Sequence, residues 1–205
     1  MTGIPDASAL IRFHDNKLND PGWPAATNVD AQAEADVWIW VQANHRYNSL
    51  LWNEEDRARR TDVGAQEIAS SKRLIDQYNQ KRNDAIEAID EAILDALDTL
   101  PEPGRARLNS ETAGSMVDRL SILSLKIFHM REQSRRADAG LDHMRRCEAK
   151  LQRLSEQRID LAACYDALIT DALAGVAYFK VYRQFKMYND PTLNPYLYAA
   201  QARSA

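Results

Sequence analysis

Polar and ionisable side chains recur along one line of residues 45–59, a stretch whose pattern predicts a helix. At 100° per residue, His45, Trp52 and Asp56 fall within about 20° of this line, and Asn48 and Arg59 within about 60°. A large aromatic residue among such groups suits a binding site with an apolar floor and polar walls. The same spacing fits an amphipathic helix whose polar edge faces solvent. The sequence leaves both interpretations open.

A second polar stripe follows steps of three and four residues and adjoins the isoleucine face of another predicted helix. Its members are Lys72, Asp76, Asn79, Asn83, Glu87 and Asp90. Asparagine is a poor residue for the middle of a helix. Asn79 and Asn83 therefore indicate either hydrogen bonds between helices or contacts with a ligand. The carboxylates of Glu87-x-x-Asp90 could contribute to a magnesium site, but no second, similarly spaced pair accompanies them. A divalent metal is therefore possible, although no specific motif supports it, and the cofactor stays unknown.

Asp118 and His129 lie within about 20° of each other on a third predicted helix. This helix is apolar on nearly every side, which predicts that it is the most buried member of the bundle. Burial and nearby charges can shift the pKa of ionisable groups strongly in such a setting. His129 is therefore a candidate general base or metal ligand, and a core histidine with satisfied hydrogen bonds is the alternative.

The C-terminal segment 176–198 interleaves basic and aromatic side chains. Such a segment can stack bases and neutralise phosphates, or lay its long side chains over the apolar end of a bundle. A net charge of −4 argues against nucleic-acid binding by the whole chain. The turn-forming sequence Asn189-Asp190-Pro191 predicts a bend, and we expect the segment to pack back over the bundle beside a site.

We predict that these stripes meet in one polar pocket, in which a histidine transfers protons, carboxylates orient it or hold a metal, and Arg59, Lys72 or Lys186 neutralises a phosphate or sugar acid. The candidate catalytic residues are His45, Asp56, Asp118 and His129. The candidate ligand-binding residues are Asn48, Trp52, Arg59, Lys72, Asp76, Asn79, Asn83, Lys186, Tyr188 and Asn189.

Long helices must position these groups, because the chain has few residues that break helices. Only seven glycines and seven prolines occur in 205 residues, too few for the many turns of an all-β sandwich. We predict an all-α fold, namely an antiparallel bundle of four long helices with a short N-terminal helix and a C-terminal segment packed over it. The expected helices cover residues 6–19, 30–60, 65–100, 109–136 and 138–175, the last ending at Gly175.

The sequence also predicts the domain organisation and the cellular location of the protein. We expect residues 1–29 to form an N-terminal appendage and residues 30–205 a single helical domain. Cys147 and Cys164 would lie roughly 25 Å apart on one helix and could not pair, which favours a reducing compartment. The sequence has no signal peptide and no apolar stretch of about 18 residues, so we expect a cytoplasmic protein without a membrane span.

Four motifs together resemble an uncharacterised bacterial family, the domain-of-unknown-function family four-two-five-four. They are HRYNSLLWNEEDRARR (45–60), KRLIDQYNQKRNDAIEAID (72–90), LNSETAGSMVDRLSILSLKIFHM (108–130) and VYRQFKMYNDPTLNPYLY (181–198). The motif positions coincide with the polar stripes. Because members of this family are often encoded near glycosyltransferases of envelope polysaccharide synthesis, the resemblance implies an accessory protein of that pathway.

Two functions are compatible with this resemblance. The first is an accessory enzyme of envelope polysaccharide or sugar-nucleotide metabolism that acts on a phosphorylated or nucleotide sugar in the polar pocket. The second is a non-catalytic helical module that binds or stabilises a glycosyltransferase, without an open pocket. The sequence also leaves open whether the chain forms a homo-oligomer.

Overall fold

Helices dominate the structure, a computed structural model that describes residues 3–25, 36–97, 106–185, 187, 190–196 and 199. The α-helices are α1 (Ala7–Leu18), α2 (Val37–Arg57), α3 (Ala65–Leu97), α4 (Ala113–Ser134) and α5 (Leu141–Leu173), and a short 3-10 helix, η1 (Ala137–Ala139), precedes α5. Two-residue strands β1 (Arg107–Leu108) and β2 (Ala177–Tyr178) pair in parallel. The predicted all-α class is confirmed.

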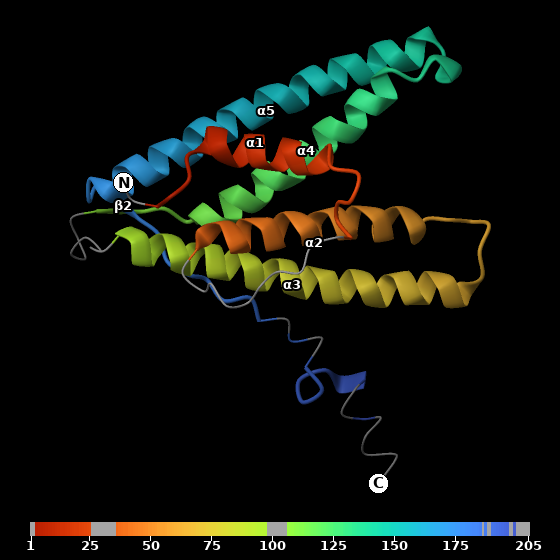
Figure 1. Ribbon diagram of the computed structural model, residues 1–205. Helices are drawn as coiled ribbons and strands as arrows, with labels where there is room; N and C mark the ends of the chain where they lie inside the picture. The colour runs from red at the N-terminus through yellow and green to blue at the C-terminus, as the bar shows by residue number, and fades with distance from the viewer. Residues whose placement is uncertain are drawn as a thin grey trace.

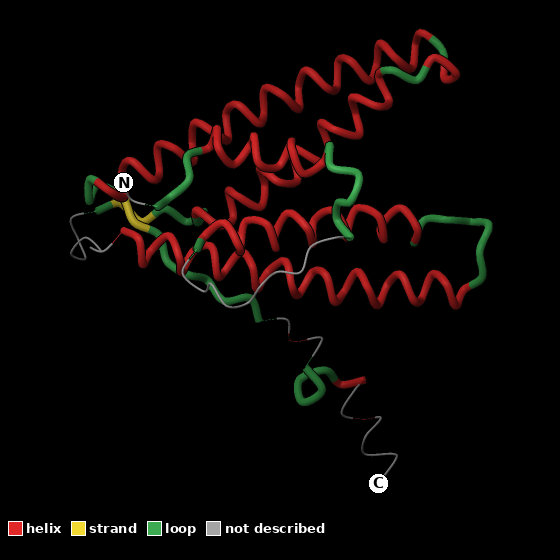
Figure 2. The backbone as a smooth tube through the Cα atoms, viewed as in Figure 1, coloured by secondary structure: helices red, strands yellow, loops and turns green. Residues whose placement is uncertain are grey.

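The helices are arranged as two hairpins, α2 with α3 and α4 with α5, and α1 lies against α4 and α5 (Figure 1). The hairpins diverge toward their turns, as the backbone trace also shows (Figure 2). Helix α4 contacts α1, α2, α3 and α5, and 11 of its 22 residues are buried. This central position agrees with the prediction from its apolar surface.

Side-chain caps fix where the helices begin. Asp6 accepts a hydrogen bond from the backbone N–H of Ala9 (2.7 Å), as aspartate commonly does at a helix N-terminus. Asp36 caps α2, and the expected start of that helix at residue 30 lies outside the described residues. Thr112 caps α4, whereas Asn109, at which that helix was expected to begin, extends the β1 pairing through its N–H to Tyr178.

Gly175 ends α5 as predicted. It adopts a φ of 69°, a left-handed conformation that favours glycine. Its N–H bonds the carbonyl of Ala172, and the N–H of Val176 bonds that of Asp171. This paired arrangement is the Schellman motif, and it redirects the chain into β2.

The N-terminal segment, expected to be an appendage, contributes to the same core as the long helices. Ala7 and Leu10 are buried in a cluster with Tyr165 of α5. The Tyr165 hydroxyl donates to the carbonyl of Pro5 (2.9 Å), and the N–H of Ala7 donates to Asp166 (2.8 Å). Helix α1 is therefore fastened to α5 at both its backbone and its apolar face.

The C-terminal segment packs over the bundle only in its first part. Phe179 is buried, and Arg183 forms ion pairs with Glu87 (2.8 Å) and Glu91 of α3. Farther along, Phe185 and Tyr196 are 86% and 89% exposed. The expected packing therefore extends as far as residue 184. Within the described residues, no helix is long and apolar enough to cross a membrane.

Helices α3 and α4 approach closely at Gly114. The N–H of Gly114 donates to Asp90 (2.6 Å), and burial raises the pKa of Asp90 to about 6. A Cβ atom at residue 114 would clash with the carbonyl oxygen of Ile86 and lie 2.9 Å from Asp90 Oδ1. Only glycine allows this separation between the two hairpins.

We predict that Gly114→Ala lowers the free energy of unfolding by about 1–3 kcal/mol, because the added methyl group must push α3 and α4 apart. Urea-induced unfolding followed by circular dichroism measures the change. Gly64→Ala is the matched control, because nothing lies within 4 Å of a Cβ atom there, and we expect it to shift the free energy by no more than about 1 kcal/mol. Equal effects from the two substitutions would contradict the account.

Candidate functional site

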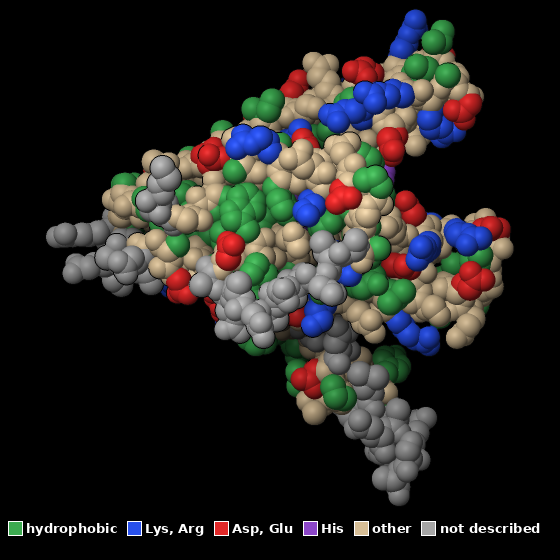
Figure 3. All heavy atoms as spheres, in the orientation of Figure 1, with side chains coloured by type: hydrophobic (Ala, Val, Ile, Leu, Met, Phe, Trp, Pro, Cys, Tyr) green, Lys and Arg blue, Asp and Glu red, His purple; other side chains and the backbone are tan. Residues whose placement is uncertain are grey.

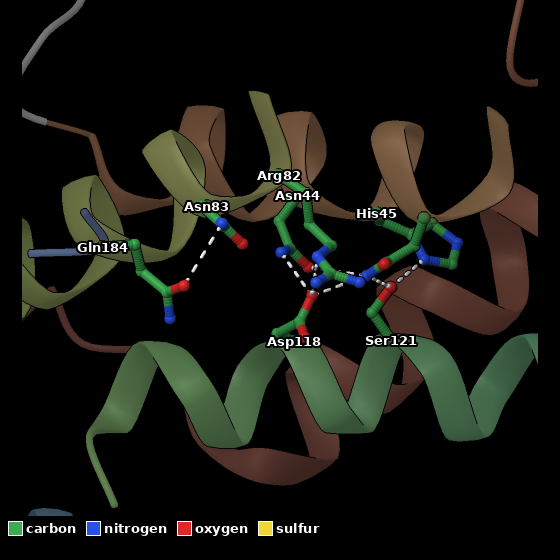
Figure 4. Close-up of polar contacts among 8 residues, drawn as sticks. Asn44, His45, Arg82, Asn83, Asp118, Ser121 and Gln184 are labelled. Atoms are coloured by element: carbon green, nitrogen blue, oxygen red, sulfur yellow. Dashed lines mark hydrogen bonds and ion pairs between the residues drawn. The ribbon is translucent and has the colours of Figure 1, made fainter. Parts of the chain in front are cut away.

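A buried carboxylate, Asp118 of α4, lies at the centre of a polar network between the hairpins (Figure 4). The side-chain amides of Asn44 and Asn48, one turn apart on α2, both donate to Asp118 Oδ1, at 2.8 and 2.9 Å. Arg82 of α3 places its Nε atom 3.9 Å from the same oxygen. Three helices are therefore joined through one carboxylate.

The network continues one turn along α4 to Ser121. The Asn48 amide donates to Ser121 Oγ (3.0 Å), and His45 Nδ1 lies 2.8 Å from that same oxygen. His45 and Ser121 are 0% exposed, and Asn48 and Asp118 are 4% and 7% exposed. The group is thus closed to solvent, and these hydrogen bonds satisfy the buried polar atoms that take part in them.

His45 also packs against a second buried histidine, His14 of α1. Their ring centroids lie 4.5 Å apart, and Trp23 stacks on His45 at 5.2 Å. Within the part of the chain that the structure describes, both ring nitrogens of His14, and Nε2 of His45, have no hydrogen-bond partner. Burial lowers the pKa of His45 to about 3, and burial together with the charges of His45 and Arg158 lowers that of His14 well below its ordinary value.

The structure therefore separates the residues that the sequence grouped into one pocket. His45, Asn48 and Asp118 occupy the closed network. Asp118 and His129 share a line on α4, but eleven residues separate them by roughly 16 Å along the helix axis. The single predicted pocket is not formed.

The α3 stripe divides in a similar way. Lys72 and Asp76 form an exposed ion pair (2.6 Å), and Asn79 is half-buried. Asn83 is buried and donates to Gln184 of the C-terminal segment (3.4 Å). These contacts match the alternative of hydrogen bonds between elements.

Three further predicted positions lie outside the described residues, and a fourth does not line the cleft described below. Lys186, Tyr188 and Asn189 are outside the described residues. Arg59 forms an exposed ion pair with Glu55 (2.5 Å).

An open cleft lies between α2, α4 and α5, beyond the closed network. Its volume is about 550 Å³, and the space-filling view shows a notch where the hairpins diverge (Figure 3). The indole of Trp52 and the imidazole of His129 are stacked there, with centroids 4.5 Å apart and planes inclined by 10°. The full lining is Trp52, Asp56, Lys126, His129, Met130, Gln133, Lys150, Arg153, Leu154 and Gln157. Trp52, Asp56 and His129 are thus brought together as predicted.

The charges of this cleft are unbalanced. Lys126, Lys150 and Arg153 line it, and no carboxylate of the described chain lies within 4.0 Å of any of them. Asp56 supplies the one carboxylate in the lining. His129 Nδ1 lies 3.2 Å from Glu132, on the rim. An aromatic floor among cations that have no carboxylate partner in the described chain suits a ligand that combines a ring with an anionic group.

Sequence reasoning missed several of these residues, although the spacing contained a signal. Lys126, His129 and Gln133 follow steps of three and four on α4, as do Lys150, Arg153 and Gln157 on α5. His14, Asn44 and Ser121 of the closed network were also missed, because nothing in the sequence indicates which small polar residues face one another.

Metal binding receives no geometric support from the carboxylates that suggested it. Glu87 accepts hydrogen bonds from Arg183 and from the N–H of Gln184 (2.9 Å), and Asp90 accepts from Gly114. Among the residues that the structure describes, no group of three or more His, Cys, Asp or Glu side chains converges as metal ligands. The residues present fit an organic anion better than a metal ion.

The fold and the site together define a class of protein: an all-α double hairpin, with a closed polar network inside and a cation-lined cleft where the hairpins separate. The family model for a protein of unknown function (DUF4254) matches residues 38–181, so the chain belongs to the domain-of-unknown-function family 4254. The match begins within α2 and includes both the network of α2 to α4 and the cleft. Comparisons with curated proteins and with solved structures give no significant match.

The buried histidines predict a pH-dependent stability. Because the folded state lowers the pKa of His14 below 6.5, unfolding takes up a proton, and stability falls as the pH drops below about 6.5. We expect His14→Phe to remove this contribution, so the difference in unfolding free energy between variant and wild type should grow by about 1.6 kcal/mol in total from pH 6.5 to 5. Urea unfolding across this range measures it. Asp90, whose pKa is raised, contributes equally to the pH dependence of both proteins, so its contribution cancels in the difference. Parallel curves would contradict the burial of a neutral histidine.

Proposed function

We propose that the cleft between α2, α4 and α5 binds a phosphorylated or nucleotide sugar, and that the protein acts on this ligand as a cytoplasmic accessory of envelope polysaccharide synthesis. The observation that carries the proposal is a stacked Trp52–His129 pair in one open cleft with three cations that no carboxylate of the described residues approaches. The link to polysaccharide synthesis rests on the resemblance described above.

Each part of the lining fits a part of such a ligand. The indole of Trp52 offers an apolar face to a sugar ring or a base. Lys126, Lys150 and Arg153 can neutralise phosphate oxygens, and the guanidinium of Arg153 can do so with two parallel hydrogen bonds. Gln133 and Gln157 can bond the sugar hydroxyls.

Of the two histidines predicted as candidates for proton transfer, we assign this role to His129, because His45 is fully buried. His129 is half-exposed in the cleft and has an ionisable partner, Glu132, at 3.2 Å. Histidine is the usual group for proton transfer near neutral pH. In the catalytic version of the proposal, His129 exchanges a proton with the ligand, and Asp56 orients a ligand hydroxyl.

Isothermal titration calorimetry with glucose 1-phosphate and with uridine diphosphate glucose tests this proposal. We expect Arg153→Gln to weaken binding about five- to tenfold through the loss of one charged hydrogen-bonding group. Arg145→Gln is the matched control, because Arg145 is exposed on the same helix but does not line the cleft, and we expect it to bind as the wild type does. The absence of binding by both ligands, or equal losses in the two variants, would contradict the proposal.

A second function, a non-catalytic module for a glycosyltransferase, is favoured by the exposed apolar residues of the C-terminal segment. Phe185 and Tyr196 are 86% and 89% exposed, and Tyr182 and Leu193 are half-exposed. Large exposed apolar side chains that gather in one segment are typical of a protein-binding surface. This segment also carries the fourth family-like motif.

Co-purification with a glycosyltransferase of envelope polysaccharide synthesis tests the second function. The double substitution Phe185→Ser and Tyr196→Ser is expected to reduce recovery of the enzyme at least fivefold, because aromatic side chains dominate protein interfaces. Leu141→Ser with Ile159→Ser is the control, since these residues are similarly exposed (69% and 67%) on α5. Unchanged recovery with the aromatic double variant would exclude this segment as the contact.

A further inference from the structure

A polar groove between α4 and α5 adjoins the cleft. Its volume is about 760 Å³, and Lys126 of α4 and Gln157 of α5 line both cavities. The two cavities therefore meet at these two residues. From this junction the cleft extends along α4 to Gln133, and the groove extends in the opposite direction to Met116. A ligand too long for one cavity can thus occupy both.

The cleft provides a largely apolar surface for a flat ring. Trp52, Met130 and Leu154 contribute apolar side chains to its lining, and the indole of Trp52 is stacked with His129. Aromatic side chains stack on nucleobases of every kind, because each base has a flat π face. A free sugar phosphate has no aromatic ring with which to stack. The cleft therefore favours a ligand that contains a base.

The groove, in contrast, is lined mostly by polar groups. Arg119 pairs with Glu111, and Arg107 lies 3.5 Å from Asp171, so these charges neutralise one another. Uncharged polar side chains such as that of Ser110 share the lining, and the leucine side chains of the floor are already buried. The groove thus offers hydrogen-bonding groups more than apolar surface, which suits a hydroxyl-rich group such as a sugar.

Two charged residues of the groove lining, Lys126 and Asp160, have no oppositely charged side chain within 4.0 Å in the described chain. Lys126 lies at the junction, whereas Asp160 follows Gln157 by one turn of α5 and lines the groove but not the cleft. The ammonium group attracts a phosphate, and the carboxylate repels a phosphate but accepts hydrogen bonds from hydroxyl groups. A phosphate is therefore favoured at the junction, and a sugar in the groove.

We propose that the ligand is a nucleoside diphosphate sugar that spans both cavities. Its base stacks on Trp52 in the cleft, its phosphates lie beside Lys126 at the junction, and its sugar lies beside Asp160 in the groove. The placement of the phosphates rests on the proposed function, whereas the base and the sugar are placed by the contrast between the two linings. Between His129 in the cleft and Ile122 in the groove, α4 rises roughly 10 Å, a length that ribose and diphosphate together can span.

Calorimetry with the full chain tests this order of base, phosphates and sugar. The probes are uridine diphosphate glucose, guanosine diphosphate mannose, the two matching nucleoside diphosphates without a sugar, and glucose 1-phosphate. We expect the preferred nucleotide sugar to bind at least tenfold more tightly than glucose 1-phosphate, because only the nucleotides have a base that can stack. It should also bind at least threefold more tightly than its own nucleoside diphosphate, because the sugar adds hydrogen bonds in the groove.

Two substitutions separate the contributions of the sugar and the base. Asp160→Asn should weaken the nucleotide sugar about five- to tenfold without weakening the nucleoside diphosphate, since only the sugar reaches Asp160. Trp52→Leu should weaken both about tenfold. Glu148→Gln is the matched control, because Glu148 is exposed on α5 and lines neither cavity, and we expect it to bind every probe as the wild type does.

The outcomes distinguish this inference from the proposed function. If glucose 1-phosphate binds and no nucleotide binds more tightly, the nucleotide ligand is overturned while the proposed function stands. If the nucleoside diphosphates bind as tightly as the nucleotide sugars, or if Asp160→Asn weakens both equally, the sugar does not lie in the groove and the inference is wrong. If no probe binds, the proposed function and the inference both fail.

Discussion

The need to satisfy one buried carboxylate organises this molecule. The buried carboxyl group of Asp118 needs hydrogen-bond donors between the helices, and Asn44 and Asn48 supply them from consecutive turns of α2. These bonds fix both the rotation and the axial position of α2 against α4. With that register set, residues one and two turns farther along α2 must meet the C-terminal half of α4, and Trp52 therefore stacks on His129.

The same polar stripe on α2 consequently serves two purposes. Near its middle, where the hairpins are in contact, the stripe closes into a network with no exposed ligand surface. Toward its end, where the hairpins diverge, the stripe opens into the cleft (Figure 1). Gly114 and Asp90 hold the opposite ends of α3 and α4 together, so the divergence is confined to the side on which the cleft lies.

Composition and periodicity were sufficient to predict the all-α class, the burial of α4 and the glycine cap of α5, because these depend on local pattern. They also associated Trp52, Asp56 and His129. The prediction of a single pocket was wrong because the angular position of a residue around a helix says nothing about its position along the helix axis. Asp118 and His129 point in the same direction from α4 but lie three turns apart along it. Lys150 and Arg153 were missed because their partner helix is set by tertiary packing, which one sequence does not reveal.

The central claim is that the polar residues divide into a closed network and an open binding cleft. The most direct measurement follows the imidazole nuclear magnetic resonance signals of the histidines while glucose 1-phosphate is added. The account predicts that the His129 signals shift with saturation, while those of His14 and His45 stay in place because both side chains are fully buried. Shifts at His45 with none at His129 would contradict it.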